Sequence, residues 1–205
     1  LPRNTEQLVT MVKLANQYDV PLYPIGNGSR FSQGVKPFQE GVLVSLRRMT
    51  NVVENRPNNM SIEVEAGMTI SQLQKVLNED NIYFPIDSND NSTIGGLIAA
   101  NGYGRKKYLH KTTRFYVMGM EFVSPQGELI NVGGRTIKNV SSYDLHQLLA
   151  GSWGVFGIIT KAILKVKPIP EKSLVLQSQA KDAKGLLEII EKVLFKEKVN
   201  LAEIT

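Results

Sequence analysis

The sequence contains no cysteine among its 205 residues, and it has only two histidines and one tryptophan. The missing cysteine excludes disulfides, thiolate metal sites, iron–sulfur ligation and a catalytic thiol. Long hydrophobic runs are also missing, since no apolar stretch reaches the ~18 residues that cross a bilayer, and from the opening residues we expect no signal peptide. We therefore expect no transmembrane segment, no metal site and a cytoplasmic location, with attachment to a membrane surface left open.

Charge of one sign is only mildly in excess. The net charge is +5 and 21% of the residues are charged, while 42% are hydrophobic, which suits a folded protein with one sizeable core. Basic residues gather between Arg105 and Lys111. A nucleic-acid patch is one interpretation, but a single short cluster is much smaller than the usual basic face. We expect a solvated loop or a rim that attracts an anionic ligand, and no nucleic-acid partner.

Glycine, by contrast, is concentrated in three segments, at residues 24–30 (PIGNGSR), 93–102 (TIGGLIAANG) and 151–160 (GSWGVFGIIT). Because glycine lacks a Cβ, its backbone amide can approach a ligand closely and adopt a positive φ. Each segment is joined to an apolar run. Together they predict a large flat ligand with a phosphate part, held by main-chain atoms, which we interpret as a flavin dinucleotide.

The first segment is neither a Rossmann fingerprint nor a P-loop. The pattern G-x-G-x-x-G would need glycine where Phe31 stands, and the acidic residue expected about twenty residues later is replaced by Arg47 and Arg48. No Gly-Lys-Ser/Thr follows. Taken alone, this loop is an ordinary turn after a strand.

The other two segments favour a ligand. Gly95 and Gly96 fall in the first turn of an apolar helix, where free N–H groups and the helix dipole favour an anion. Glycine costs a helix ~1 kcal/mol relative to alanine, and packing could explain one of the two. The third segment ends in a strand that could line an adenine slot through the main chain of Ile158 and Ile159; the alternative is a tight crossing in the core.

Apolar periodicity and turn residues predict an α+β chain. A proline pair, Pro168 and Pro170, indicates a domain boundary. The expected helices are 5–18, 69–77, 94–100, 143–150 and 182–195, and the expected strands are 21–25, 41–46, 52–53, 62–66, 117–123, 128–132, 157–166, 174–177 and a last one starting near 199.

Five motifs in a fixed order carry a family resemblance. The three glycine segments are joined by Ser124-Pro125-Gln126-Gly127-Glu128 and by Lys138-Asn139-Val140-Ser141-Ser142-Tyr143-Asp144-Leu145. From about Pro2 to Pro170 the chain resembles the flavin-binding domain of the vanillyl-alcohol oxidase and para-cresol methylhydroxylase (PCMH) family. Within that family it is most similar to the branch of glycolate oxidase subunits and FAD-linked D-lactate dehydrogenases.

The resemblance implies a two-lobed, PCMH-type α+β domain over 1–170. A small βαβ lobe would end at about residue 66, and a larger mixed-sheet lobe would follow over 67–170, with FAD extended between them. Residues 171–205 would begin a second α+β domain, a truncated substrate or cap domain, so the fragment need not be active alone.

The resemblance also implies the cofactor site. The predicted diphosphate contacts are in the first loop with Gly95 and Gly96 opposite, Pro85 and Asp87 lie near the ribityl chain or flavin, and Ile159 meets the adenine. The full predicted set is Pro24, Ile25, Gly26, Asn27, Gly28, Ser29, Pro85, Asp87, Thr93, Gly95, Gly96, Asn101, Gly102, Gly154 and Ile159.

The chain departs from the family pattern at three places. Ile25 stands where a positive residue is common, Trp153 replaces a frequent acidic residue, and Tyr103 interrupts a frequent Gly-Gly. The first loop also lacks the histidine to which some relatives attach the flavin covalently. We therefore expect non-covalent FAD.

The implied function is an FAD-dependent dehydrogenase that oxidises a small 2-hydroxy acid, such as glycolate or D-lactate, by hydride transfer. Such a reaction needs a base, a cation for the carboxylate and a dry surface. Arg105, His110, Arg114 and Lys138 are the available candidates, with His110 expected on a surface loop and His146 expected to be structural. No catalytic residue is assigned, because the family's base lies mostly in the second domain. The alternatives are a non-catalytic electron-relay subunit and, more remotely, a nucleic-acid-binding module.

Overall fold

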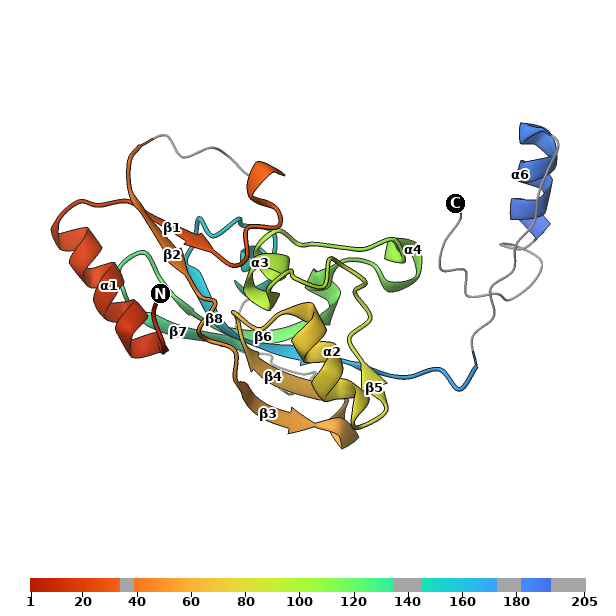
Figure 1. Cartoon of the computed structure of the whole chain (residues 1–205), viewed down its shortest axis with the longest axis horizontal. Coiled ribbons are helices and arrows are strands. Elements are labelled where there is room, and N and C mark those ends of the chain that lie inside the picture. The colour runs from red at the N-terminus through yellow and green to blue at the C-terminus, as the bar shows by residue number, and fades with distance from the viewer. Residues whose placement is uncertain (34–38, 135–144, 173–181, 193–205) are drawn as a thin grey trace.

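The computed structural model describes residues 1–33, 39–134, 145–172 and 182–192. Helices and strands are both present, so the predicted α+β class is confirmed (Figure 1). The helices are α1 (Thr5–Gln17), α2 (Ile70–Asn78), α3 (Ile94–Ala99), α4 (Lys107–His110), α5 (Leu145–Leu149) and α6 (Ala183–Glu191), and the strands are β1 (Leu22–Ile25), β2 (Val42–Ser45), β3 (Val52–Arg56), β4 (Ser61–Glu65), β5 (Ile82–Tyr83), β6 (Val117–Val123), β7 (Leu129–Gly133), β8 (Ile158–Lys165) and β9 (Lys167–Pro168).

The N-terminal unit is α1 beside the parallel pair β1–β2 (Figure 1). Asn4 caps α1 by accepting a hydrogen bond from the Gln7 amide, and α1 buries Leu8, Val12 and Ala15 on one face. The sequence predicted a βαβ lobe. Between β1 and β2 the described residues show only a short 3-10 helix, Phe31–Gln33.

The main sheet has the order β3-β4-β8-β6-β7, and each of its pairings is antiparallel. The prediction of a mixed sheet is therefore wrong for this layer. Short reversals join β3 to β4 through Pro57–Asn59 and β6 to β7 through the predicted 124–127 turn, and such reversals make antiparallel neighbours. β3 and β4 precede residue 66 yet pair in this sheet, so the lobe bounds stay a prediction.

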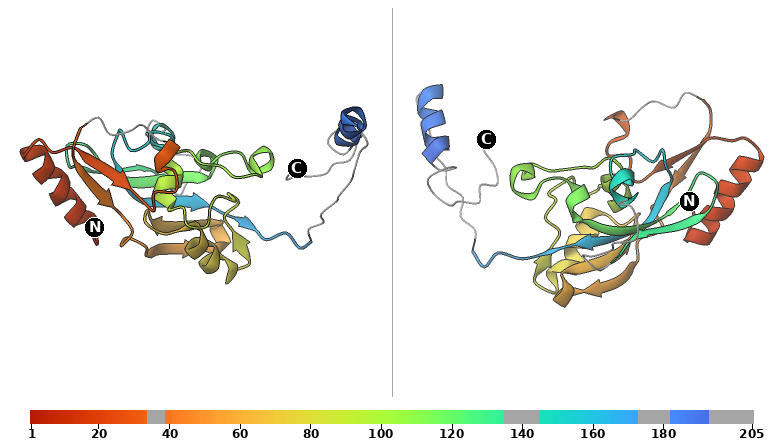
Figure 2. Two further views of the ribbon diagram at one scale, coloured as in Figure 1. Left: turned by 45° about the horizontal axis from the view of Figure 1, so that its top comes forward. Right: turned by 180° about the vertical axis from the view of Figure 1, so that it is seen from behind.

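Two capped helices cover part of the sheet. Thr69 and Gln72 form the predicted capping box of α2, which buries Ile70, Leu73 and Leu77. Thr93 caps α3, and α3 packs against β8. Thr69 and Thr93 are bridge partners, so the two helix starts lie side by side. Figure 2 shows the same arrangement from two further directions.

Several predicted elements lie partly or wholly outside the described residues. The strands expected at 174–177 and near 199 are outside, as is the start of the helix expected at 143–150, whose described part is α5. The helix expected from Asp182 is present as α6, with Asp182 as its cap.

Candidate functional site

The three glycine segments meet in the structure. A Cβ on Gly26 would overlap Thr93 Oγ1, which brings the first segment onto the second. A Cβ on Gly154 would lie 2.8 Å from Pro24 Cγ, which brings the third segment onto the first. The Trp153 amide donates to the Ala99 carbonyl at 2.9 Å, which joins the third segment to the end of α3. Stretches far apart in the sequence therefore form one wall.

The first loop leaves consecutive backbone amides without a partner in the described chain. Gly28 has a φ of +73°, a conformation that glycine adopts without strain. The amides of Asn27, Gly28 and Ser29 donate no hydrogen bond to any other part of the chain that the structure describes. Side chains hold the loop instead, because Asn27 Nδ2 donates to the Asn91 carbonyl at 2.8 Å and Ser29 Oγ lies 3.1 Å from Ser92 Oγ. Consecutive unused amides fit a diphosphate.

The start of α3 is used differently from the prediction. The Gly95 amide donates to the Ala66 carbonyl at 2.8 Å, and a Cβ on Gly95 would lie 2.9 Å from the Ala66 Cβ. The expectation that this amide is free for an anion is therefore wrong, because the carbonyl of Ala66, directly after β4, accepts its hydrogen bond. The Gly96 amide donates to Thr93 Oγ1 at 3.3 Å, but Gly96 itself is exposed.

A cavity of about 460 Å³ lies beside the first loop. Arg30 Nη2 donates to Ser88 Oγ at 2.7 Å at this cavity. Burial lowers the pKa of Arg30, but an arginine remains a cation. A Cβ on Gly104 would overlap Asp87. The residues that line the cavity are Ser29, Arg30, Gln33, Asp87, Ser88, Asn89, Ser92, Tyr103, Gly104 and Arg105.

Two of these residues, Ser29 and Asp87, belong to the predicted set. Arg30 and Gly104 were missed as site residues, although signals existed in the sequence. Arg30 directly follows the first loop, and Gly104 stands two positions after Gly102. Ser88, Asn89 and Ser92 come from the 87–92 segment, whose position depends on tertiary contacts, and Gln33, Tyr103 and Arg105 complete the lining.

A second cavity, of about 300 Å³, is lined by Pro24 and Gly154, whose contact joins the first and third segments. Its walls come from α1, from the residues around β1, from 123–125 and from 154–158. Gly154 and Ile158 line this cavity, whereas Ile159 is buried in β8 and does not. Apolar side chains such as Val12, Leu22 and Val155 line it together with polar ones such as Asn16, Asp19 and Ser124.

The other predicted residues are distributed around this wall. Pro85 and Gly102 are buried, and Ile25 is half-buried. Asn101 has a φ of +44°, and its Oδ1 accepts a hydrogen bond from the Arg114 amide at 3.1 Å. Lys138 lies outside the described residues.

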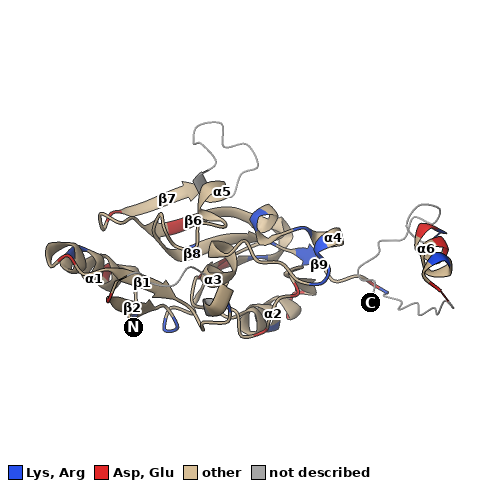
Figure 3. Ribbon diagram, turned by 90° about the horizontal axis from the view of Figure 1, so that it is seen from above, with Lys and Arg blue, Asp and Glu red and all other residues tan. Residues whose placement is uncertain are grey.

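His110 is not on the surface, which corrects the prediction, because it is only 6% exposed. Its Nδ1 lies 3.5 Å from Lys167 Nζ and its ring meets the Tyr83 ring edge-on. Burial, with Lys167 and Lys106, lowers the pKa of His110 against the opposing effect of Asp87. The neighbouring residues Arg105, Lys106, Lys107 and Lys111 are exposed. Figure 3 shows basic residues at α4 and β9. His146 lies on α5 beside Gln147.

Comparison with known proteins identifies the family. The family model described as "FAD binding domain" matches residues 1–133. The chain belongs to this FAD-binding domain family. FAD is therefore its cofactor, and the unused amides of the first loop fit that assignment. In the described ranges no helix is long and apolar enough to cross a membrane, and no cluster of histidine and carboxylate residues could hold a metal ion.

Named relatives include D-lactate dehydrogenase of Archaeoglobus fulgidus, 37% identical over 82% of this chain and 38% of that protein. Glycolate oxidase subunit GlcD of Bacillus subtilis is 33% identical over 83% of this chain and 37% of that protein. A solved structure of alkyldihydroxyacetonephosphate synthase has a TM-score of 0.71 and 27% identity, over 83% of this chain and 32% of that one. The chain thus spans well under half the length of these relatives.

Proposed function

We propose that this chain is the FAD-binding part of an FAD-linked dehydrogenase that oxidises a small 2-hydroxy acid, such as glycolate or D-lactate. The observation that carries the proposal is the convergence of the three glycine segments beside the unused amides of Asn27, Gly28 and Ser29. The similarity to D-lactate dehydrogenase and glycolate oxidase subunits supports the substrate class.

In this proposal each of the two cavities holds a different part of the cofactor. The diphosphate binds the 27–29 amides, and the Arg30 guanidinium at the neighbouring cavity offsets part of its charge. The adenine enters the second cavity, which Gly154 and Ile158 help to line. The ribityl chain and flavin extend along the other cavity, past Asp87, toward the wall formed by Thr93, Asn101 and Gly102.

Bound FAD supplies a two-electron acceptor for the hydride that leaves the hydroxyl-bearing carbon. The residues of this chain bind and orient the cofactor and exclude water from its apolar end. We assign no base among them. The base and the carboxylate-binding cation are proposed to lie in the polypeptide that follows, of which residues 171–205 would form the beginning.

We also propose that FAD is held without a covalent bond. The sequence has no cysteine, and the first loop has no histidine. Backbone amides and one guanidinium then make the main contacts with the diphosphate. Heating should release the cofactor intact into the supernatant, where its mass distinguishes FAD from FMN.

The test of function uses the full polypeptide that carries this chain, purified with FAD and mixed anaerobically with D-lactate or glycolate. Loss of the visible flavin absorbance with one of them, and not with L-lactate for the D-lactate reaction, is the expected result. An electron-relay subunit is the competing function. Flavin that dithionite reduces but that neither hydroxy acid reduces would favour the relay over the dehydrogenase.

A further inference from the structure

Arg114 joins two of the three glycine segments. It lies in the 3-10 helix Thr113–Tyr116, just before β6. Its backbone amide donates to Asn101 Oδ1 at 3.1 Å, and its Nη2 donates to the Ala150 carbonyl at 2.5 Å. A Cβ on Gly151 would lie 3.5 Å from Arg114 Nη2 and 3.4 Å from the Asn101 Cβ. Arg114 thus contacts both sides of this junction, Asn101 through its backbone amide and Ala150 through its guanidinium.

The backbone at this junction is held in unusual conformations. Asn101, Gly151 and Trp153 all have positive φ values, of +44°, +97° and +55°. For a residue other than glycine this region costs about 1–2 kcal/mol. Hydrogen bonds from the Gly151 amide to the Ile98 carbonyl and from the Trp153 amide to the Ala99 carbonyl fix the turn on α3. Arg114 adds a further hydrogen bond, to the Ala150 carbonyl.

One hydrogen-bond donor of the Arg114 guanidinium has no partner among the described residues. Arg114 Nε is buried and has no acceptor in the described parts of the chain. A buried donor without a partner costs about 1–3 kcal/mol. A buried donor without a partner calls for an explanation, and a role in shaping the cleft supplies one.

We infer that Arg114 is a positioning residue for FAD, which fixes Asn101 and the Gly151–Gly154 turn relative to each other. It acts through these two elements and touches neither substrate nor reacting atoms. Without its guanidinium, the Gly151–Gly154 turn shifts relative to Asn101, and the cleft that holds the cofactor becomes less rigid. The inference rests on the proposed FAD placement and extends it to a residue outside the predicted binding set.

The variants are chosen to separate geometry from charge. Arg114→Lys keeps the cation but loses the planar fork of donors, and Arg114→Ala removes both. Arg47→Ala is the matched control, because it removes an exposed arginine at the end of β2. Each 205-residue chain is prepared without cofactor, and its thermal unfolding is recorded first so that binding is measured while every variant is folded.

FAD binding is followed by flavin fluorescence and by circular dichroism of the bound flavin in the visible range. We expect Arg114→Ala to raise the Kd by at least about tenfold, the size of one lost charge-assisted hydrogen bond. Arg114→Lys should raise it less and also change the flavin dichroism, while Arg47→Ala should change neither.

Two results would overturn the inference in different ways. A lower unfolding temperature with unchanged Kd and dichroism would make Arg114 purely structural. Should Arg114→Ala fail to fold, the same readouts on Arg114→Lys decide the matter. Absence of FAD binding by the unsubstituted chain would overturn the FAD placement itself, and this inference with it.

Discussion

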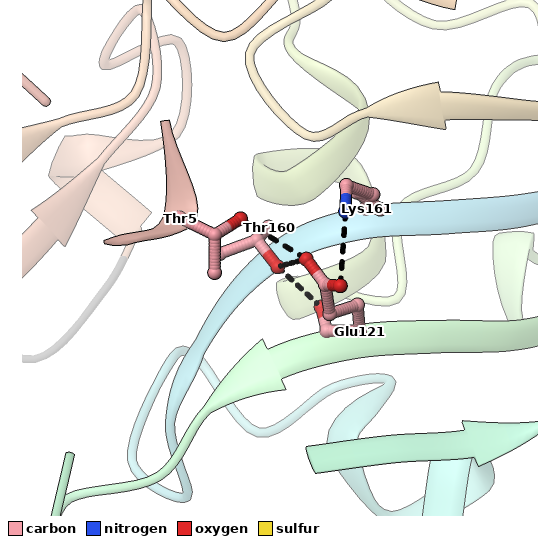
Figure 4. A network of polar contacts seen from close by, with 4 residues as sticks. All are labelled: Thr5, Glu121, Thr160 and Lys161. Atoms are coloured by element: carbon pink, nitrogen blue, oxygen red, sulfur yellow. Dashed lines mark hydrogen bonds and ion pairs between the residues drawn. The ribbon is translucent and has the colours of Figure 1, made fainter. Parts of the chain in front are cut away.

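At the scale of single residues, Glu121 holds the N-terminal helix to the main sheet. Its carboxylate on β6 accepts hydrogen bonds from Thr5 Oγ1 at 3.0 Å, Thr160 Oγ1 at 2.7 Å and Lys161 Nζ at 2.9 Å (Figure 4). Burial raises the pKa of Glu121, but the hydrogen bonds from Lys161, Thr160 and Thr5, together with the charge of Lys161, outweigh burial and lower it. The ionised carboxylate is therefore the form that the fold stabilises.

Replacing Glu121 with glutamine should lower the free energy of unfolding at neutral pH by about 1.5–3 kcal/mol, the range for hydrogen bonds to a charged group. Because the pKa is lower in the folded state, this stabilisation is fully present above the unfolded-state pKa. It is lost as the pH falls through the folded-state pKa. Urea unfolding at a series of pH values should show the two proteins converging in acid.

The matched control is Glu6→Gln, an exposed carboxylate on the same helix as Thr5. It should change stability little at any pH. A Glu121→Gln difference that stays constant from neutral to acid would mean that packing, and not the charge, accounts for the effect.

Sequence alone identifies which residues are unusual here, but not what they contact. Gly95 is conspicuous as the first of two glycines at a helix start. The structural reason for a glycine there is its close contact with Ala66, which directly follows β4. His110 sits among lysines in the sequence, which suggests exposure. Its burial comes from Tyr83 and Lys167, which β5 and β9 bring to it. Such tertiary contacts leave no local pattern to read.

At the scale of elements, the sequence predicts helix starts well because caps are local. Thr69 with Gln72, and Thr93 with Gly96, form within one turn of the chain. Strand pairing is not local. β4 pairs with β8, which lies about a hundred residues later, and alternating apolar residues cannot specify that partner or its direction.

The α2 cap allows a direct check of this reading. Thr69→Ala should lower the free energy of unfolding by about 1 kcal/mol, because the Gln72 amide loses its acceptor. Thr69→Ser keeps a hydroxyl in the same place and should recover most of the loss. Thermal unfolding monitored by circular dichroism measures both. Equal destabilisation by serine and alanine would show that the methyl group, and not the cap, matters.

At the scale of the whole molecule, the fold brings the three glycine segments, which are far apart in the sequence, into contact. The parallel pair β1–β2 places the first loop against the start of α3, and the turn before β8 closes on Pro24. Pro24 and Gly154 line one cavity, and Ser29 and Arg30 line the other. The first glycine segment thus borders both cavities, which suits an extended dinucleotide.

The central claim is that the first loop binds the diphosphate of FAD. The most direct measurement compares Gly28→Asp with Gly28→Asn by calorimetric titration of FAD and of ADP. Both side chains tolerate a positive φ, so backbone strain is matched and only the charge differs. The aspartate should weaken both ligands about 10–100-fold relative to the asparagine, as expected for a unit charge a few ångströms from a phosphate. Equal affinities for the two variants, at equal stability, would place the diphosphate elsewhere.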